Sequence, residues 1–206
     1  MKISSIVLGI YATNCYVVQG DGAKSCVLID PADSGKALVS ELNRLGLSPE
    51  AVLLTHGHYD HILAVPELQA AFPQLPVYCH YLDVPEAKVE LDMGQKYPTV
   101  SAFANVVPLK GGEPLHLAGL SFQVLHTPGH TKGSVTYILP EVLFTGDTLF
   151  QGSIGRTDFP GGNMEEMERS LKLLKELPGD YRVLPGHDAE TTLEAERRHN
   201  PYMSWL

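Results

Sequence analysis

Four apolar runs in this chain each end at a glycine-containing turn, and each turn carries histidine or aspartate side chains. The run at 52–54 precedes His56, and the other three turns carry His130, Asp147 and His187. Short apolar runs bounded by such turns are typical of buried strands. Glycine lets the backbone turn sharply and approach its neighbours closely. The pattern predicts that the four turns leave strand ends along one edge of a β scaffold.

Hydrophobic periodicity predicts an order of strands followed by helix that occurs twice. We expect strands at residues 2–8, 15–18, 25–29, 51–54, 105–107, 114–117, 121–125, 134–139, 142–144 and 181–184. We expect helices from Ser34 to a stop at Gly46, within the amphipathic segment 61–72, at 163–177 and near 190–198. Asn163 with Glu166 three residues later resembles a capping box. This order predicts an α/β (α+β) chain with two sheets face to face and helices outside, a four-layer αββα sandwich.

Composition narrows the class of protein. The chain has 206 residues, 44% hydrophobic and 19% charged, which fits one globular domain over 1–206 and excludes a disordered, collagen-like or coiled-coil chain. Its net charge of −9 argues against nucleic acid or an anionic membrane as partner. Residues 1–10 read as a first strand rather than a signal peptide. The cysteines (Cys15, Cys26 and Cys79) show no C-x-x-C spacing. We therefore expect a cytoplasmic protein.

The run from His56 to His61 has the form H-x-H-x-D-H, with His58 and Asp60 between its ends. Imidazole and carboxylate together suit zinc and iron. Four such side chains so close in sequence cannot all reach one tetrahedral ion from a regular strand. On a tight turn they can divide between two ions, His56 and His58 to one and Asp60 and His61 to the other. With the three other turns, the candidate set holds five histidines and two aspartates.

The order of Asp30, the H-x-H-x-D-H run, His130, Asp147 and His187 resembles the metallo-β-lactamase superfamily over nearly the whole chain. The resemblance implies that superfamily's αββα fold. It implies a first metal site and a second one, made respectively of His56, His58 and His130, and of Asp60, His61 and His187. It also implies that Asp147 bridges both ions and that Asp30 orients ligands without binding metal. An Asp30 that only caps the turn before Pro31 is the alternative.

The segment 146–159 resembles glyoxalase II, the hydroxyacylglutathione hydrolases, and 191–202 is similar to their short bacterial relatives. This implies two divalent ions, zinc first with iron or manganese as alternatives, and a metal-bridged hydroxide that attacks the carbonyl of a hydroxyacyl-thiol such as S-lactoylglutathione. Asp60 and Asp147 are the candidate catalytic carboxylates. Arg156 is the candidate for pairing with a substrate carboxylate. A salt bridge from Arg156 to Asp158 is the alternative.

The chain also departs from the longer glyoxalase II enzymes, which carry a C-terminal helical domain that supplies basic residues for glutathione. We expect no such domain here. Arg156 and Asp158 replace their Lys and Tyr, and Leu63 and Ala64 replace the small residues that usually follow H-x-H-x-D-H. The expected partner is a small-molecule thioester, with a glutathione conjugate as one candidate. We expect a monomer or a homodimer, and no role is assigned to residues 86–104.

Two rival functions remain open. Persulfide dioxygenases share the G-R-T-D-F stretch at 155–159 and hold one iron with the equivalents of His56, His130 and Asp147. A non-catalytic metal-binding module is the second rival. Seven candidate ligands argue against it, because a structural zinc needs only four.

Overall fold

The structure, a computed structural model, describes residues 1–84, 98–204 and 206. The strands are β1 (Lys2–Leu8), β2 (Thr13–Gln19), β3 (Ser25–Ile29), β4 (Ser48–Leu53), β5 (Val77–His80), β6 (Val106–Leu109), β7 (Pro114–Leu117), β8 (Leu120–His126), β9 (Val135–Leu139), β10 (Val142–Gly146), β11 (Leu149–Phe150), β12 (Ser153–Ile154), β13 (Arg182–Pro185) and β14 (Thr191–Thr192). The helices are α1 (Gly35–Leu45), α2 (Val65–Ala71), α3 (Met164–Lys175) and α4 (Leu193–His199), with short 3-10 helices η1 (Tyr59–His61) and η2 (Val100–Ala102).

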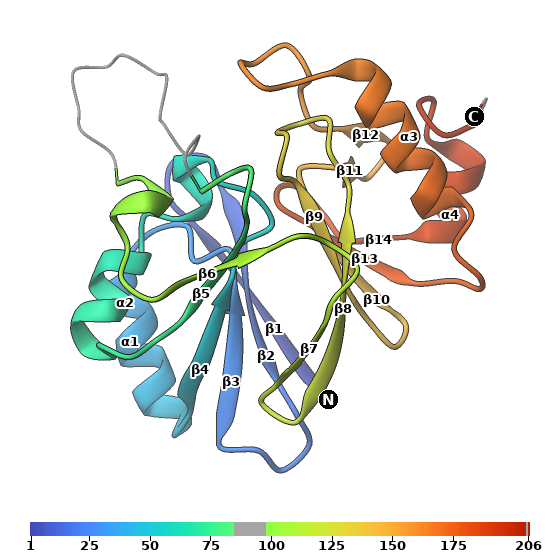
Figure 1. Cartoon of the computed structure of the whole chain (residues 1–206). Coiled ribbons are helices and arrows are strands. Elements are labelled where there is room, and N and C mark those ends of the chain that lie inside the picture. The colour runs from blue at the N-terminus through green and yellow to red at the C-terminus, as the bar shows by residue number, and fades with distance from the viewer. Residues whose placement is uncertain (85–97, 205) are drawn as a thin grey trace.

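These elements form the predicted four-layer αββα sandwich. One sheet has the strand order β1-β2-β3-β4-β5-β6 and the other has β14-β13-β10-β9-β8-β7, while β11 and β12 pair separately. In Figure 1, α1 and α2 lie on the outer side of the first sheet, and α3 and α4 lie on the outer side of the second. No helix in the described part of the chain is long and apolar enough to cross a membrane.

Three apolar layers hold the sandwich together. Alternate residues of one strand serve different layers: Cys15 and Val17 of β2 pack toward α1 and α2, whereas Tyr16 and Val18 pack between the two sheets. A third layer lies between the second sheet and helices α3 and α4, around Met167, Leu171 and Leu174. This alternation follows from the two-residue period of a strand. A strand that is buried on both faces therefore reads as an unbroken apolar run.

Helix ends match their local sequence signals. Asn163 precedes α3, and its side chain accepts a hydrogen bond of 3.0 Å from the backbone N–H of Glu166. Gly46 ends α1 with a φ of 66°, in the left-handed region that favours glycine. The last helix was expected from residue 190 but begins at Leu193, because Thr191 and Thr192 first pair with β13.

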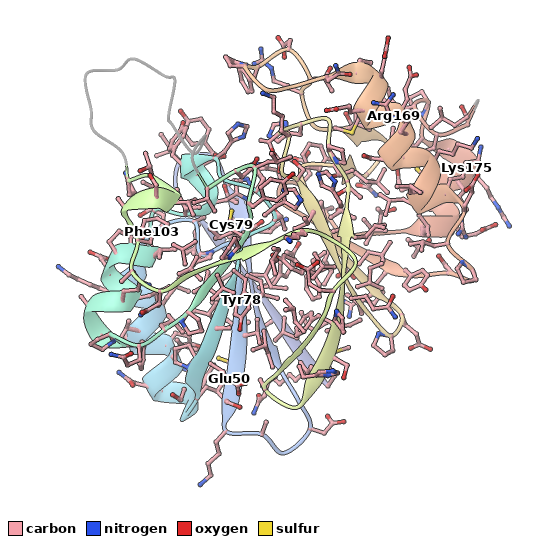
Figure 2. The ribbon with its side chains drawn as sticks, viewed as in Figure 1. Glu50, Tyr78, Cys79, Phe103, Arg169 and Lys175 are labelled. Atoms are coloured by element: carbon pink, nitrogen blue, oxygen red, sulfur yellow. The ribbon has the colours of Figure 1, made fainter. Side chains whose placement is uncertain are left out.

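Strand β5 was not predicted. Residues 86–97 of the segment 86–104, to which no role was assigned, lie outside the described residues. β5 is four residues long and runs parallel to β4 and β6. Its neighbouring residues Tyr78 and Cys79 are both labelled in Figure 2. Tyr78 packs against the layer between the sheets, and Cys79 belongs to the layer under α1 and α2. So short a segment gives too few residues for a periodic signal.

Strand direction decides where the functional turns meet. β3, β4 and β5 are parallel, so the turns after them lie at the same edge of the first sheet. In the second sheet, β10 is parallel to β13, and β8 is antiparallel to β9, which is antiparallel to β10. The turns after β8, β10 and β13 therefore also share one edge.

Candidate metal centre

The predicted metal-binding side chains come from turns that follow four strands. His56 and His58 lie in the turn after β4, which continues into η1 with Asp60 and His61. The turns after β8, β10 and β13 carry the three other side chains, which are His130, Asp147 and His187. The sequence prediction that these turns leave strand ends is confirmed. All seven side chains lie near one another, in the groups described next.

The first cluster consists of His56, His58 and His130. One ring nitrogen from each lies within 4.8 Å of the others. Nδ1 of His130 lies 2.7 Å from the carbonyl oxygen of Arg156. A carbonyl only accepts, so this nitrogen donates, and Nε2 of a neutral His130 is left without a proton. That Nε2 lies 2.8 Å from Nδ1 of His58. The two nitrogens can share a proton or bind one cation.

The second cluster consists of Asp60, His61 and His187, which also bring their ligand atoms within 4.8 Å of one another. His187 donates from Nδ1 to the carbonyl oxygen of Tyr11 at 3.1 Å. In a neutral His187, Nε2 therefore directs an unprotonated lone pair at Oδ2 of Asp60, 3.4 Å away. A lone pair that faces a carboxylate is unfavourable unless a proton or a cation lies between them.

Asp147 lies between the two clusters. Its Oδ2 is 3.4 Å from Nε2 of His130 in the first cluster and 3.6 Å from Nε2 of His187 in the second. Its Oδ1 is 3.5 Å from Nε2 of His61. A single carboxylate thus faces ligand atoms of both clusters.

Asp30 orients two of the histidines through hydrogen bonds on the Nδ1 side of their rings. Its Oδ2 lies 3.0 Å from Nδ1 of His61 and accepts a 2.6 Å hydrogen bond from the hydroxyl of Thr55. The Thr55 hydroxyl in turn lies 3.0 Å from Nδ1 of His56 and accepts from it. Both rings are thereby held with Nε2 directed away from Asp30. Carboxylate partners of this kind orient metal-binding histidines and fix their tautomer.

Asp30, His56 and His61 also bring one ligand atom each within 4.8 Å of one another. The Asp30 oxygens, however, already accept from the backbone N–H of Thr55 at 2.8 Å, from its hydroxyl and from His61. We therefore favour an orienting role over a ligand role for Asp30. Its φ of 50° is unusual for a residue other than glycine, and such strain is concentrated at functional sites.

Unpaired buried atoms test whether a cation fits. Among the described residues, Nε2 of His56, Nε2 of His61 and Oδ1 of Asp147 are buried and have no hydrogen-bond partner. An unpaired buried polar atom is costly. These three atoms belong to the predicted ligand set, and all are acceptors when the rings are neutral and their Nδ1 atoms donate. The residues present fit divalent cations with nitrogen and oxygen ligands.

The pKa shifts of the site show that the second cluster favours positive charge. Burial alone would lower the pKa of His61, but Asp147, Asp60 and Asp30 outweigh burial and raise it to about 10. Burial alone would raise the pKa of Asp60, but the nearby histidines lower it. In the first cluster, burial and then His130 lower the pKa of His58 to about 4. The second cluster therefore attracts a cation, and the first keeps neutral rings whose lone pairs can bind metal.

Close approach of the turns requires glycine at two positions. A Cβ on Gly186 would lie 2.3 Å from Oδ1 of Asp147 and 2.7 Å from Cε1 of His61. A Cβ on Gly146, which has a φ of 50°, would lie 2.3 Å from the Thr55 hydroxyl. Both glycines let strands of opposite sheets bring their turns together.

The guanidinium of Arg156 pairs with Asp158, at 2.9 Å and 2.8 Å. It also lies over the ring of Phe159, 4.1 Å from the ring centroid. The alternative interpretation of Arg156, a salt bridge to Asp158, is therefore present in the structure. The Arg156 side chain is also 63% exposed. Its use in binding substrate stays a prediction.

Two residues of the site were missed by the sequence analysis. Thr55 transmits the hydrogen bonding from Asp30 to His56. Asp83 is buried and follows β5. It accepts hydrogen bonds from Gly57, in the turn that carries His56 and His58, and from Thr131 beside His130. For Thr55, its place directly before the H-x-H run was an available signal. Asp83 gave none, because it belongs to no motif.

Comparison with known proteins supports this interpretation. The sequence model of the Metallo-beta-lactamase superfamily matches residues 8–187. The Haemophilus influenzae protein named hydroxyacylglutathione hydrolase GloC is 35% identical over 213 residues, which cover 99% of this chain and 99% of that protein.

Two solved structures are similar over nearly their whole length. The crystal structure of the BLEG-1 B3 metallo-beta-lactamase has a TM-score of 0.91 and 37% identity, covering 98% of this chain and 100% of that one. The crystal structure of TTHA1623 in a di-iron-bound form has a TM-score of 0.85 and 43% identity, covering 97% of this chain and 99% of that one.

Proposed function

Because the chain belongs to the metallo-β-lactamase superfamily, we propose that it is a metal-dependent hydrolase that cleaves thioesters. The proposed substrate is a hydroxyacyl-thiol of the S-lactoylglutathione kind. The proposed cofactor is a pair of divalent ions, with zinc first and iron or manganese as alternatives. The first cluster would hold one ion and the second cluster the other.

The position of Asp147 carries the proposal. Its two carboxylate oxygens lie 3.4 Å to 3.6 Å from ring nitrogens of both clusters. That arrangement suits one carboxylate shared by two neighbouring ions. A closed structural zinc site would need only four ligands and no such shared group.

When bound, two neighbouring divalent ions would supply a water of low pKa as nucleophile and polarise the substrate carbonyl. The chain's own residues determine how that chemistry is arranged. Asp30 and Thr55 hold the His61 and His56 rings in place. The carbonyl of Arg156 holds His130. These contacts leave the ring Nε2 atoms free to bind metal.

A protein nucleophile is not supported by the cysteines. Cys15, Cys26 and Cys79 are buried, and burial raises the pKa of each thiol, that of Cys26 to about 12. A thiol with so high a pKa forms little thiolate at neutral pH. A thioester also needs no strong acid to protonate the leaving group, because a thiolate departs readily. Both points favour hydrolysis by water.

The name of the Haemophilus influenzae relative, a hydroxyacylglutathione hydrolase, supports glutathione as the thiol. Arg156 is the proposed contact to a substrate carboxylate, since a guanidinium held by one carboxylate retains unpaired N–H donors. Asp60 and Asp147 are the proposed catalytic carboxylates. A cytoplasmic location and a monomeric or homodimeric state stay predictions.

The deciding experiment combines metal content with two assays on one preparation. Protein purified without added metal or chelator is analysed for zinc, iron and manganese per chain. S-lactoylglutathione hydrolysis is then followed in parallel with oxygen uptake in the presence of glutathione persulfide. We expect about two ions per chain, hydrolysis and no oxygen uptake. The Asp147→Asn variant serves as the matched inactive control.

One iron per chain with persulfide-dependent oxygen uptake would support the dioxygenase alternative at His56, His130 and Asp147. Absence of hydrolysis with every acyl-thiol tested on the metal-replete protein would refute the thioesterase proposal.

A further inference from the structure

Asp83 is a buried carboxylate outside the predicted ligand set. It follows β5 and is 3% exposed. Its Oδ2 accepts hydrogen bonds from the backbone N–H of Gly57 at 2.9 Å and from the hydroxyl of Thr131 at 2.8 Å. Its Oδ1 accepts from the backbone N–H of Gly133 at 2.7 Å. A buried carboxylate is costly unless it is hydrogen-bonded, and these three donors offset that cost.

The donors belong to the two turns that build the first cluster. Gly57 stands between His56 and His58 in the turn after β4 of the first sheet. Thr131 directly follows His130 in the connection between β8 and β9 of the second sheet. One carboxylate therefore joins the metal-binding turns of opposite sheets. The contact is tight, because a Cβ on Gly133 would lie 2.4 Å from Oδ1 of Asp83.

We propose that Asp83 is a positioning residue that holds the turn of His56 and His58 against the turn of His130, so that the three rings meet in metal-binding geometry. The inference rests on the proposed metal binding, and it does not depend on which substrate is hydrolysed. Asp83 is not one of the proposed metal ligands. Its effect passes through the backbone of Gly57 and through the hydroxyl of Thr131.

The second cluster gives the proposal a selective signature. Asp147 and His187 follow β10 and β13, and none of the Asp83 hydrogen bonds named above reaches those two turns. Loss of Asp83 should therefore weaken the first cluster more than the second. A general loss of folding would weaken both.

The main variant is Asp83→Asn. The amide keeps the size of the carboxylate, but it replaces one acceptor oxygen by an NH₂ group. Whichever way the amide turns, its NH₂ group then faces either the backbone N–H of Gly133 or the backbone N–H of Gly57 and the hydroxyl of Thr131. Thr131→Val removes the hydroxyl link to Asp83, together with the 2.7 Å hydrogen bond between the Thr131 and Ser134 hydroxyls, and serves where Asp83→Asn fails to fold. Thr131→Ser keeps the hydroxyl that Thr131→Val removes, and it should bind zinc like the unmodified chain.

Glu196→Gln is a matched control. Glu196 is also buried and also accepts three hydrogen bonds, from Gly152, Thr191 and Asn200. Those partners lie around α4, outside both clusters. This variant should lose stability for the same chemical reason as Asp83→Asn, with no effect on the metal-binding turns.

Zinc affinity is measured by equilibrium competition with a chromophoric chelator, and Co²⁺ absorption spectra report the ligand geometry. The variants are compared in the full chain and in a His187→Ala background, which isolates the first cluster. The unfolding free energy of the metal-free proteins is measured by chemical denaturation. Neither zinc binding nor the spectrum requires turnover, so a failure of the thioesterase proposal would leave this test intact.

We expect Asp83→Asn to weaken zinc binding at the first cluster by about 10-fold to 100-fold and to change the Co²⁺ spectrum. Thr131→Val should have a smaller effect in the same direction, and Glu196→Gln should bind zinc like the unmodified chain. Wild-type affinity in both Asp83→Asn and Thr131→Val would overturn the proposal. So would an equal loss of affinity in Glu196→Gln.

Discussion

Nε2 of His130 lies 3.4 Å from Oδ2 of Asp147, although the two residues follow different strands of the second sheet. β8 and β10 are separated by β9 and run in the same direction, so their turns emerge at the same edge. The same carboxylate faces His61, which comes from the first sheet. The meeting of the two sheets at this edge is what assembles the metal centre.

Replacement of the Asp147 carboxylate should weaken the binding of one of the two ions. For Asp147→Asn, we expect metal content to fall from about two ions per chain to about one. Thioester hydrolysis should fall at least about 100-fold, since the charge stabilisation by a metal ion contributes several kcal/mol. Metal analysis and steady-state kinetics on the same sample test this. Full activity with two bound ions would show that Asp147 is dispensable.

Asp30 should act through the histidines that it orients. Asp30→Asn replaces an acceptor of three hydrogen bonds, two from Thr55 and one from His61. We expect metal affinity to fall by about 10-fold to 100-fold, as for other residues that orient metal-binding histidines. Chelator competition measures it, with the exposed Asp21→Asn as control. Unchanged affinity would leave Asp30 with only its turn-capping role.

Gly186→Ala should displace the turn of His187. The new Cβ would lie 2.3 Å from Oδ1 of Asp147, so the turn or the carboxylate has to move. We expect loss of metal from the second cluster and slower hydrolysis. Gly22→Ala is the control, because Gly22 has a positive φ of 70° but, among the described residues, nothing lies within 4 Å of its Cβ position. Retention of two ions by the Gly186→Ala variant would contradict the role assigned to this close approach.

The stability of the fold should depend on pH through His80, which lies outside the metal centre. His80 is buried, its ring stacks on that of His126 at 4.2 Å, and its Nε2 donates to the carbonyl of Lys110 at 3.1 Å. Burial and then His126 lower the pKa of His80 below its usual value of 6.5, while the hydrogen bond to the Lys110 carbonyl and then Glu113 oppose the shift. The folded state therefore binds this proton less readily than the unfolded state does.

By linkage, the contribution of neutral His80 is present above about pH 6.5 and is lost as the pH falls below that value. His80→Gln keeps a donor for the Lys110 carbonyl but does not titrate. Chemical denaturation of both proteins without metal, at several pH values between about 5 and 8, gives their difference in unfolding free energy. We expect that difference to shrink toward low pH. A constant difference would show that His80 does not contribute to the pH dependence.

Much of the metal centre could be predicted from local sequence. His56, His58, Asp60 and His61 are close together in the chain, so a single turn is enough to bring them together. His130, Asp147 and His187 were found because each follows an apolar run and a glycine. The strand boundaries were also predictable where runs were long, as at β1 and β3. Strands β5, β11, β12 and β14 were not predicted, because segments of two to four residues are too short to show a periodic pattern.

Thr55 and Asp83 show where local reasoning ends. Threonine and aspartate occur throughout any chain. The place of Thr55 directly before the H-x-H run was the one local signal, and no motif surrounds Asp83. Asp83 contacts Gly57 and Thr131, which are distant from it in sequence and belong to opposite sides of the sandwich. Such contacts depend on the packing distance between the sheets.

The sequence by itself determined the kinds of ligand, their order and the strand-end turns that carry them, because these depend on residue type and short-range spacing. Only the tertiary structure decided which nitrogen of each ring faces the centre, which carboxylate lies between the clusters and which one stands behind the histidines. Those features depend on hydrogen bonds between turns of different sheets, whose distances are set when the three apolar layers pack.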